Sequence, residues 1–223
     1  WPDPPGLGWP SWAFENHDAP RALSRWTPEG VDGQAYARMK MALLCALRGN
    51  IILYNGEELG LDQVEIPFEL VKDPEALKNW PLTLSRDGAR TPLPWAAGET
   101  HAGFSSADPW LPLGAAHGAL AVDRQQADPA SLLNLTRHLV ALRAAHPALR
   151  LGRDARWIAE GDLLVFDRIA DGEHIRCLFN LGGGTIDAAV HAAGGVPVVA
   201  LNGADPAHLP PCGALWLKLE GTN

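Results

Sequence analysis

The chain has 223 residues, of which 47% are hydrophobic and 20% are charged, and its formal net charge is −8 at pH 7. This composition is typical of a globular protein and excludes disordered and collagen-like chains. No apolar run reaches the roughly 18 residues of a membrane-spanning helix, so we expect no membrane partner. The acidic balance, without a basic patch, also argues against a nucleic-acid partner.

The three cysteines, Cys45, Cys177 and Cys212, lie far apart in the sequence. Their odd number and wide spacing argue against a disulfide framework and against a zinc site built from paired cysteines. We interpret Cys45 and Cys177, which fall in apolar segments, as small buried hydrophobic residues. The pattern favours a reducing compartment, so we expect a cytoplasmic protein. As separate expectations, this chain holds no metal site and the protein needs no cofactor.

The first predicted strand is the apolar run Trp12–Phe14, which follows a segment rich in proline and glycine. The run stops at the polar residues 15–18, Glu-Asn-His-Asp. A buried strand that ends in polar side chains is how a βα unit presents chemistry at its carboxyl end. The cluster Phe14–Arg21, FENHDAPR, is therefore the sharpest candidate for a functional site.

A helix is predicted from about Gln34 to Leu47, because apolar residues recur three or four positions apart and Asp32 can cap its start. Residues 51–54, Ile-Ile-Leu-Tyr, predict a second strand buried on both faces, as in parallel sheets. The stretch 60–127 has many prolines and little periodicity. A stretch of this length is usually functional or carries small elements of its own.

A second long helix is predicted up to about Ala145, with Asp128 as its N-cap and Pro129 in its first turn. Its apolar stripe recurs at helical spacing. The stripe consists of Leu132, Leu135, Leu139 and Leu142.

The periodicity changes from about residue 153 onward. Runs at 163–166 and 175–181 flank the turn pair Asp171–Gly172, which predicts a β-hairpin. Three more short apolar runs, separated by glycine and proline turns, lie at 186–190, 197–201 and 214–219. This part of the chain, about 70 residues, is predicted to be a small all-β domain.

Two strand–helix units cannot form a covered parallel sheet, because both strands would be edges. A complete (β/α)₈ barrel takes about 250 residues. We therefore predict an α/β protein in which residues 1–150 form the carboxyl-terminal end of a (β/α)₈ TIM barrel, incomplete in this chain. Residues 151–223 would follow as a small antiparallel β-sandwich domain. The alternative is a small α/β domain of a different kind.

Three motifs carry a resemblance to a known family. Residues 8–26, GWPSWAFENHDAPRALSRW, resemble the region around the seventh barrel strand of the α-amylase superfamily, glycoside hydrolase family 13. The fourth signature region of that family is an aromatic residue, a variable residue and then Asn-His-Asp, which Phe14–Asp18 fits. Residues 52–61 resemble its eighth-strand region, with Asn55 where the family usually has Gln.

Residues 86–95, RDGARTPLPW, resemble a stretch of the bacterial α-glucosidases and oligo-1,6-glucosidases within that family, with Leu93 in place of the usual Met. The resemblance covers essentially the whole chain and implies that the barrel part contains strands 7 and 8 with their helices. The family's nucleophile and acid/base carboxylates come from earlier strands, upstream of this chain. A structural calcium in the missing part stays open.

The resemblance implies roles for four residues. Asp18 matches the third catalytic carboxylate, which stabilises the transition state, and His17 matches the histidine that donates to the same glucose. Arg86 matches an arginine that binds the non-reducing glucose and usually pairs with an aspartate near the first strand, outside this chain. Arg90 is expected near the aglycone side. The structural alternative for Asp18 is an ion pair with Arg21 that holds the loop.

The implied function is a retaining, exo-acting α-glucosidase that releases α-glucose from the non-reducing end of short α-glucosides such as maltose, with glucosyl transfer to acceptors left open. The chain alone is expected to be an inactive fragment that works with the amino-terminal part of the same enzyme. The alternatives are a sucrose hydrolase or transglucosidase of the same family, or a non-catalytic binding subunit.

Overall fold

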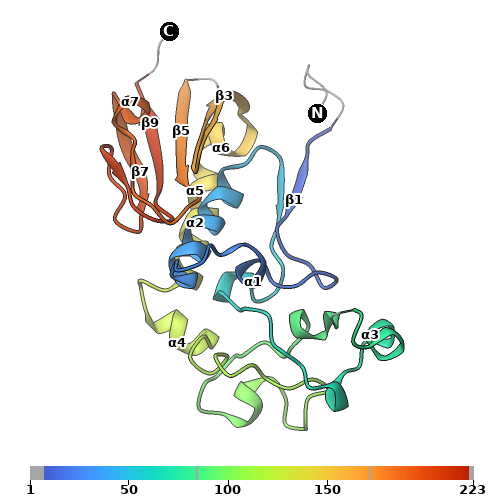
Figure 1. Ribbon diagram of the computed structural model, residues 1–223. Coiled ribbons are helices and arrows are strands. Elements are labelled where there is room, and N and C mark those ends of the chain that lie inside the picture. The colour runs from blue at the N-terminus through green and yellow to red at the C-terminus, as the bar shows by residue number, and fades with distance from the viewer. Residues whose placement is uncertain (1–7, 84, 171, 221–223) are drawn as a thin grey trace. The chain divides into compact units, whose positions relative to one another are not determined.

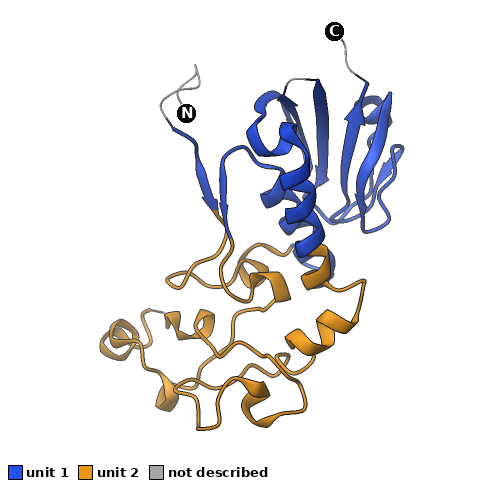
Figure 2. Cartoon of the chain, turned by 180° about the vertical axis from the view of Figure 1, so that it is seen from behind, with its two compact units in different colours: residues 1–12, 28–52, 136–223 blue, residues 13–27, 53–135 orange. Residues whose placement is uncertain are grey.

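The structure is a computed structural model that describes residues 8–83, 85–170 and 172–220. It divides into two compact units (Figure 2). Unit 1 comprises residues 1–12, 28–52 and 136–223, and unit 2 comprises residues 13–27 and 53–135. In the described residues, no helix is long and apolar enough to cross a membrane.

Unit 1 contains a five-stranded antiparallel sheet in the order β3-β4-β5-β9-β7. The predicted hairpin is confirmed: Ala170 of β4 pairs with Glu173 of β5, and Gly172 has a φ of +75°, which suits glycine. Asp171, predicted in the same turn, lies outside the described residues. The strands of the sheet are β3 (Arg153–Glu160), β4 (Leu163–Ala170), β5 (Glu173–Asn180), β7 (Gly195–Leu201) and β9 (Ala214–Leu219).

The predicted run 186–190 is wrong as a single strand. It is the two-residue strand β6 (Ile186–Asp187), followed by the short helix α7 (Ala189–Ala192). β6 pairs with β8 (His208–Leu209), which the sequence did not reveal. The edge strand β3 was also missed, because five of its eight residues are exposed and it has no continuous apolar run.

The two faces of the sheet are covered differently. On one face, Val165, Leu178 and Leu215 lie in register and pack in one core with residues of α7 and β8. On the other face, the fully buried Phe166 pairs across the strands with Cys177. Helices α2 (Gly33–Ala46) and α6 (Pro147–Leu151) contact the sheet within unit 1 (Figure 1). The division of the chain at residue 150 and the sandwich form of its second part stay predictions.

The helix predicted over 34–47 is confirmed as α2, and the side chain of Asp32 accepts a hydrogen bond from the amide of Ala35 at 2.9 Å. The predicted start of the second long helix is wrong. α5 spans Leu132–Ala145, and the hydroxyl of Ser131 accepts the capping bond from the amide of Asn134 at 3.2 Å. Asp128 instead ends α4 (Val122–Ala127).

The two predicted strands near the amino terminus are present as β1 (Ser11–Ala13) and β2 (Asn50–Ile52), which pair with each other. The burial predicted for the first strand, and on both faces for the second, is wrong for this chain, since both strands have exposed residues at each end and Ile52 is 52% exposed. The physical reason is the small size of the sheet, because two strands alone leave both faces open.

Unit 2 is built from short elements, as expected for the stretch 60–127. The buried Gln125 joins them: its amide nitrogen donates to the carbonyls of Leu59 at 2.8 Å and Leu120 at 3.0 Å, and its oxygen accepts from the amide of Leu133 at 3.0 Å. The remaining elements of this unit are α1 (Ala22–Trp26), η1 (Glu57–Leu59), η2 (Phe68–Leu70), α3 (Pro74–Asn79), η3 (Arg86–Ala89) and η4 (Thr100–Gly103).

Two buried arginines bind the backbone at the carboxyl end of α2. Arg143 donates to the carbonyls of Cys45, Leu47 and Gly49. Arg168 donates to the carbonyls of Ala46 at 2.6 Å and of the residue before β3. Burial lowers the pKa of both guanidinium groups, that of Arg168 to about 10. They satisfy carbonyls that a helix end leaves without intrahelical partners.

We predict that Arg143→Met destabilises the protein by at least about 1–3 kcal/mol, the cost of a buried acceptor that loses its donor. Methionine keeps the apolar stem and has a similar helix propensity. The measurement is urea unfolding followed by tryptophan fluorescence. Arg150→Met, at an exposed position of α6, is the matched control and should stay within about 0.5 kcal/mol of the wild type. Equal effects of the two substitutions would refute the capping role.

Candidate active site

Asp18 lies in the loop after β1, and two arginines converge on one of its carboxylate oxygens. Oδ1 of Asp18 accepts from Nη1 of Arg86 at 3.2 Å and from Nη2 of Arg90 at 3.0 Å. The Asp18 side chain remains 55% exposed. The amide of Asp18 donates to the side chain of Asn16 at 2.8 Å, so the turn itself is stabilised locally.

His17 completes the group. Its Nε2 lies 3.4 Å from Oδ2 of Asp18, the oxygen that the arginines do not contact. Nε of Arg90 donates to the carbonyl of His17 at 2.7 Å. All four predicted site residues therefore lie together in unit 2, although about 70 residues of chain separate the two pairs. Their roles toward a substrate stay predictions.

Arg86 also forms an ion pair that the sequence did not reveal. Its Nε donates to Oδ2 of Asp73 at 2.8 Å, and its Nη2 donates to Oδ1 at 2.6 Å. The aspartate near the first strand that the resemblance pairs with Arg86 stays a prediction, and Asp73 is a different partner, within this chain. The hydrogen bond from Arg86 holds the pKa of Asp73 well below its usual range, and the same pairing raises the pKa of Arg86.

Arg21 is not the partner of Asp18. Its Nη1 donates to Oε2 of Glu15 at 3.0 Å, and both side chains are buried. The other oxygen of Glu15 accepts from the amide of Ala22 at 3.2 Å. The guanidinium group of Arg21 also lies over the ring of Tyr54, 4.5 Å from its centroid. The Glu15–Arg21 pair thus holds the two ends of the loop that contains Asp18.

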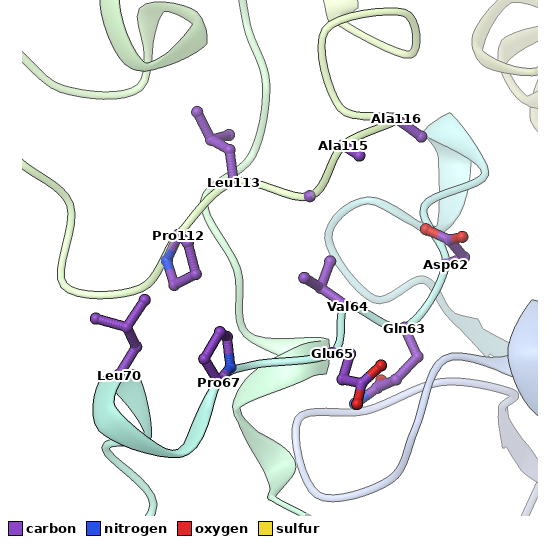
Figure 3. Close-up of a pocket in the computed structure, with 11 residues that line it drawn as sticks. Asp62, Gln63, Val64, Glu65, Pro67, Leu70, Pro112, Leu113, Ala115 and Ala116 are labelled. Carbon is purple, nitrogen blue, oxygen red and sulfur yellow. The ribbon is translucent and has the colours of Figure 1, made fainter.

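A pocket of about 480 Å³ lies elsewhere in unit 2, between residues 62–70 and 112–116 (Figure 3). Pro67, Leu70 and Pro112 form an apolar end, and Asp62 lies at the opposite end. The four predicted site residues are not among those that line it. Within the described part of the chain, no cluster of three or more histidine, cysteine or acidic side chains has the arrangement of a metal site.

Comparisons with known proteins identify the family. Residues 4–152, more than half of the chain, match the family described as "Alpha amylase, catalytic domain". This chain belongs to the α-amylase family.

Its relatives in that family include a probable α-glucosidase of Rhizobium meliloti (strain 1021), 43% identical over 174 residues that cover 78% of this chain and 31% of the relative. A probable oligo-1,6-glucosidase of Bacillus subtilis (strain 168) is 34% identical over 163 residues, 65% of this chain and 29% of the relative. The chain thus spans about a third of the length of these α-amylase family members.

Two solved structures are also similar to this chain. The α-glucosyl transfer enzyme XgtA is 41% identical, with a TM-score of 0.87, and the match covers 96% of this chain and 41% of XgtA. The trehalulose synthase MutB from Pseudomonas mesoacidophila MX-45 is 26% identical, with a TM-score of 0.82 and coverage of 96% and 44%. The α/β fold predicted from the sequence agrees with these matches to α-amylase family proteins.

The sequence analysis of this α-amylase family chain did not identify Asp73 as a site residue, although the sequence contains one signal for its local structure. Asp73 precedes Pro74, and an aspartate before proline is a typical helix N-cap. The structure confirms the cap, because the Asp73 side chain accepts from the amide of Glu75 at 3.1 Å. The pattern predicts a helix start but gives no sign of the distant arginine.

We predict that Glu15→Gln destabilises the protein by about 3–5 kcal/mol, because it leaves the charge of Arg21 buried without its counter-ion. The change should appear as a lower urea midpoint. Glu69→Gln, at an exposed carboxylate of the same unit, is the control and should be nearly neutral. A loss below about 1 kcal/mol for Glu15→Gln, as for a surface pair, would show that this pair does not hold the loop.

Proposed function

We propose that this chain is the carboxyl-terminal part of a retaining, exo-acting α-glucosidase that releases α-glucose from the non-reducing end of short α-glucosides. The observation that carries the proposal is the gathering of Asp18, His17, Arg86 and Arg90 in the loops that follow the predicted barrel strands. The names of the two bacterial relatives, an α-glucosidase and an oligo-1,6-glucosidase, support it.

In this proposal, Asp18 stabilises the transition state. Arg86 and Arg90 hold one of its oxygens, so Oδ2 and the neighbouring His17 are free to bind hydroxyl groups of one glucose. A charged hydrogen bond gains strength as the sugar ring distorts toward an oxocarbenium ion, so the contact favours the transition state over the substrate. Arg86 contributes to binding the non-reducing glucose, and Arg90 lies toward the aglycone.

Retaining glycosidases need a nucleophile and an acid/base carboxylate about 5–5.5 Å apart. We propose that both come from the amino-terminal part of the same enzyme, with which residues 1–150 complete a (β/α)₈ barrel. The open faces of the β1–β2 sheet support this, since further strands and helices would cover them. Residues 151–223 form the accompanying β-sandwich domain. We propose that the enzyme is cytoplasmic and needs no cofactor.

A transglucosidase of the same family is the second candidate. The match to a glucosyl transfer enzyme, with a TM-score of 0.87 over 96% of this chain, favours it. The two candidates share the glucose-binding site and differ in whether water or a sugar hydroxyl accepts the glucosyl group.

The substrate test uses the full-length protein on maltose, an aryl α-glucoside, sucrose and starch, with products separated by chromatography. We expect α-glucose from maltose and from the aryl glucoside, and little cleavage inside starch chains. The chain alone should be inactive, because two of the three carboxylates are missing. Longer glucosides as the main products would establish the transglucosidase, and rapid internal cleavage of starch would contradict exo-action.

We predict that Asp18→Asn in the full-length protein lowers kcat at least about a hundredfold, the typical loss when one transition-state contact is removed. The melting temperature should change little, because the Asp18 side chain is more than half exposed. Asp108→Asn is the matched control, since its carboxylate is 99% exposed. Near-normal kcat for Asp18→Asn would refute the catalytic assignment.

A further inference from the structure

We propose that Asp73 is a positioning residue for the site: its carboxylate fixes the guanidinium group of Arg86 so that Nη1 of Arg86 holds Oδ1 of Asp18. This inference rests on the proposed function of Asp18. It adds to the site an acidic residue besides Asp18, distinct from the nucleophile and from the acid/base carboxylate, which we expect upstream.

Asp73 itself is buried and held by several hydrogen bonds. Its side chain is 1% exposed, and its amide donates to Oδ2 of the buried Asp87 at 2.9 Å. It caps α3 through the amide of Glu75, and Pro74 occupies the first turn of that helix. The amide of Arg86 also donates to Oδ2 of Asp73, at 3.0 Å. Asp73 therefore presents its carboxylate from a fixed backbone position.

The geometry of the pair orients Arg86. Nε and Nη2 of Arg86 contact the two oxygens of Asp73 in a fork, at 2.8 and 2.6 Å. Such bidentate pairs fix the plane of a guanidinium group as well as its position. Because Nε and Nη2 face Asp73, the remaining nitrogen Nη1 faces Asp18, at 3.2 Å from Oδ1.

The second arginine is oriented by the same principle but with a different partner. Nε of Arg90 donates to the carbonyl of His17, and its Nη2 reaches the same Oδ1 of Asp18. Each arginine thus has its Nε anchored and offers one Nη to Asp18. Because both arginines donate to Oδ1, the half-exposed carboxylate of Asp18 is held with Oδ2 beside His17. In this proposal, Oδ2 is the atom that binds the sugar.

The test is Asp73→Asn in the full-length protein, assayed on maltose for kcat and KM and by thermal melting. Asparagine has nearly the same size as aspartate and can still cap α3. It lacks the second carboxylate oxygen and the negative charge, so it cannot accept the bidentate, charge-assisted hydrogen bonds from Arg86. Asp32→Asn, at the N-cap of α2, is the matched control for the effect on a cap. Arg86→Lys, alone and combined with Asp73→Asn, tests whether the two residues act as one unit.

We expect Asp73→Asn to lower kcat about tenfold or more with a smaller change in KM, because a misplaced contact acts mainly on the transition state. Arg86→Lys should give a similar loss, and the double variant should be no worse than the poorer single one. A kcat for Asp73→Asn equal to that of Asp32→Asn would overturn the inference, as would losses that multiply in the double variant. A wild type without activity on α-glucosides would overturn the proposed function and this inference with it.

Discussion

Unit 2 contains little β-sheet, so many of its backbone N–H and C=O groups need hydrogen-bond partners other than neighbouring strands. Buried polar side chains provide several of these partners. Asp87 accepts from the amides of Lys72 and Asp73, and Gln125 bonds three separate backbone groups. An unpaired buried amide or carbonyl costs free energy comparable to a lost hydrogen bond. The side chains of Asp87 and Gln125 therefore stabilise the irregular backbone of unit 2.

The same constraint places charge at the candidate site. Once Asp87 fixes the backbone around Asp73, the buried carboxylate of Asp73 needs a cation, and Arg86 supplies it. Arg86 is 33% exposed, so it reaches from that buried partner to the half-exposed Asp18. These ion pairs lead from the buried Asp73 to the half-exposed Asp18, whose Oδ2 lies beside His17.

Unit 1 uses buried arginines in the same way. Arg143 and Arg168 donate to carbonyls at the end of α2, where no further helical turn supplies amide donors for them. Their burial lowers the pKa of both groups, that of Arg168 to about 10. The antiparallel sheet, by contrast, pairs backbone groups between its neighbouring strands, and apolar side chains form a core on one of its faces.

The sequence by itself determined the features that depend on neighbouring residues: helix α2 with its Asp32 cap, the β4–β5 hairpin, and the Asn-His-Asp motif that carries the family resemblance. Local propensity and periodicity are strong enough to predict these. The tertiary structure alone decided the start of α5, the edge strand β3 and the pairing of Asp73 with Arg86. The two residues of that pair are 13 positions apart in the sequence. No helical or strand periodicity predicts that their side chains meet, so only the folded path of the chain brings them together.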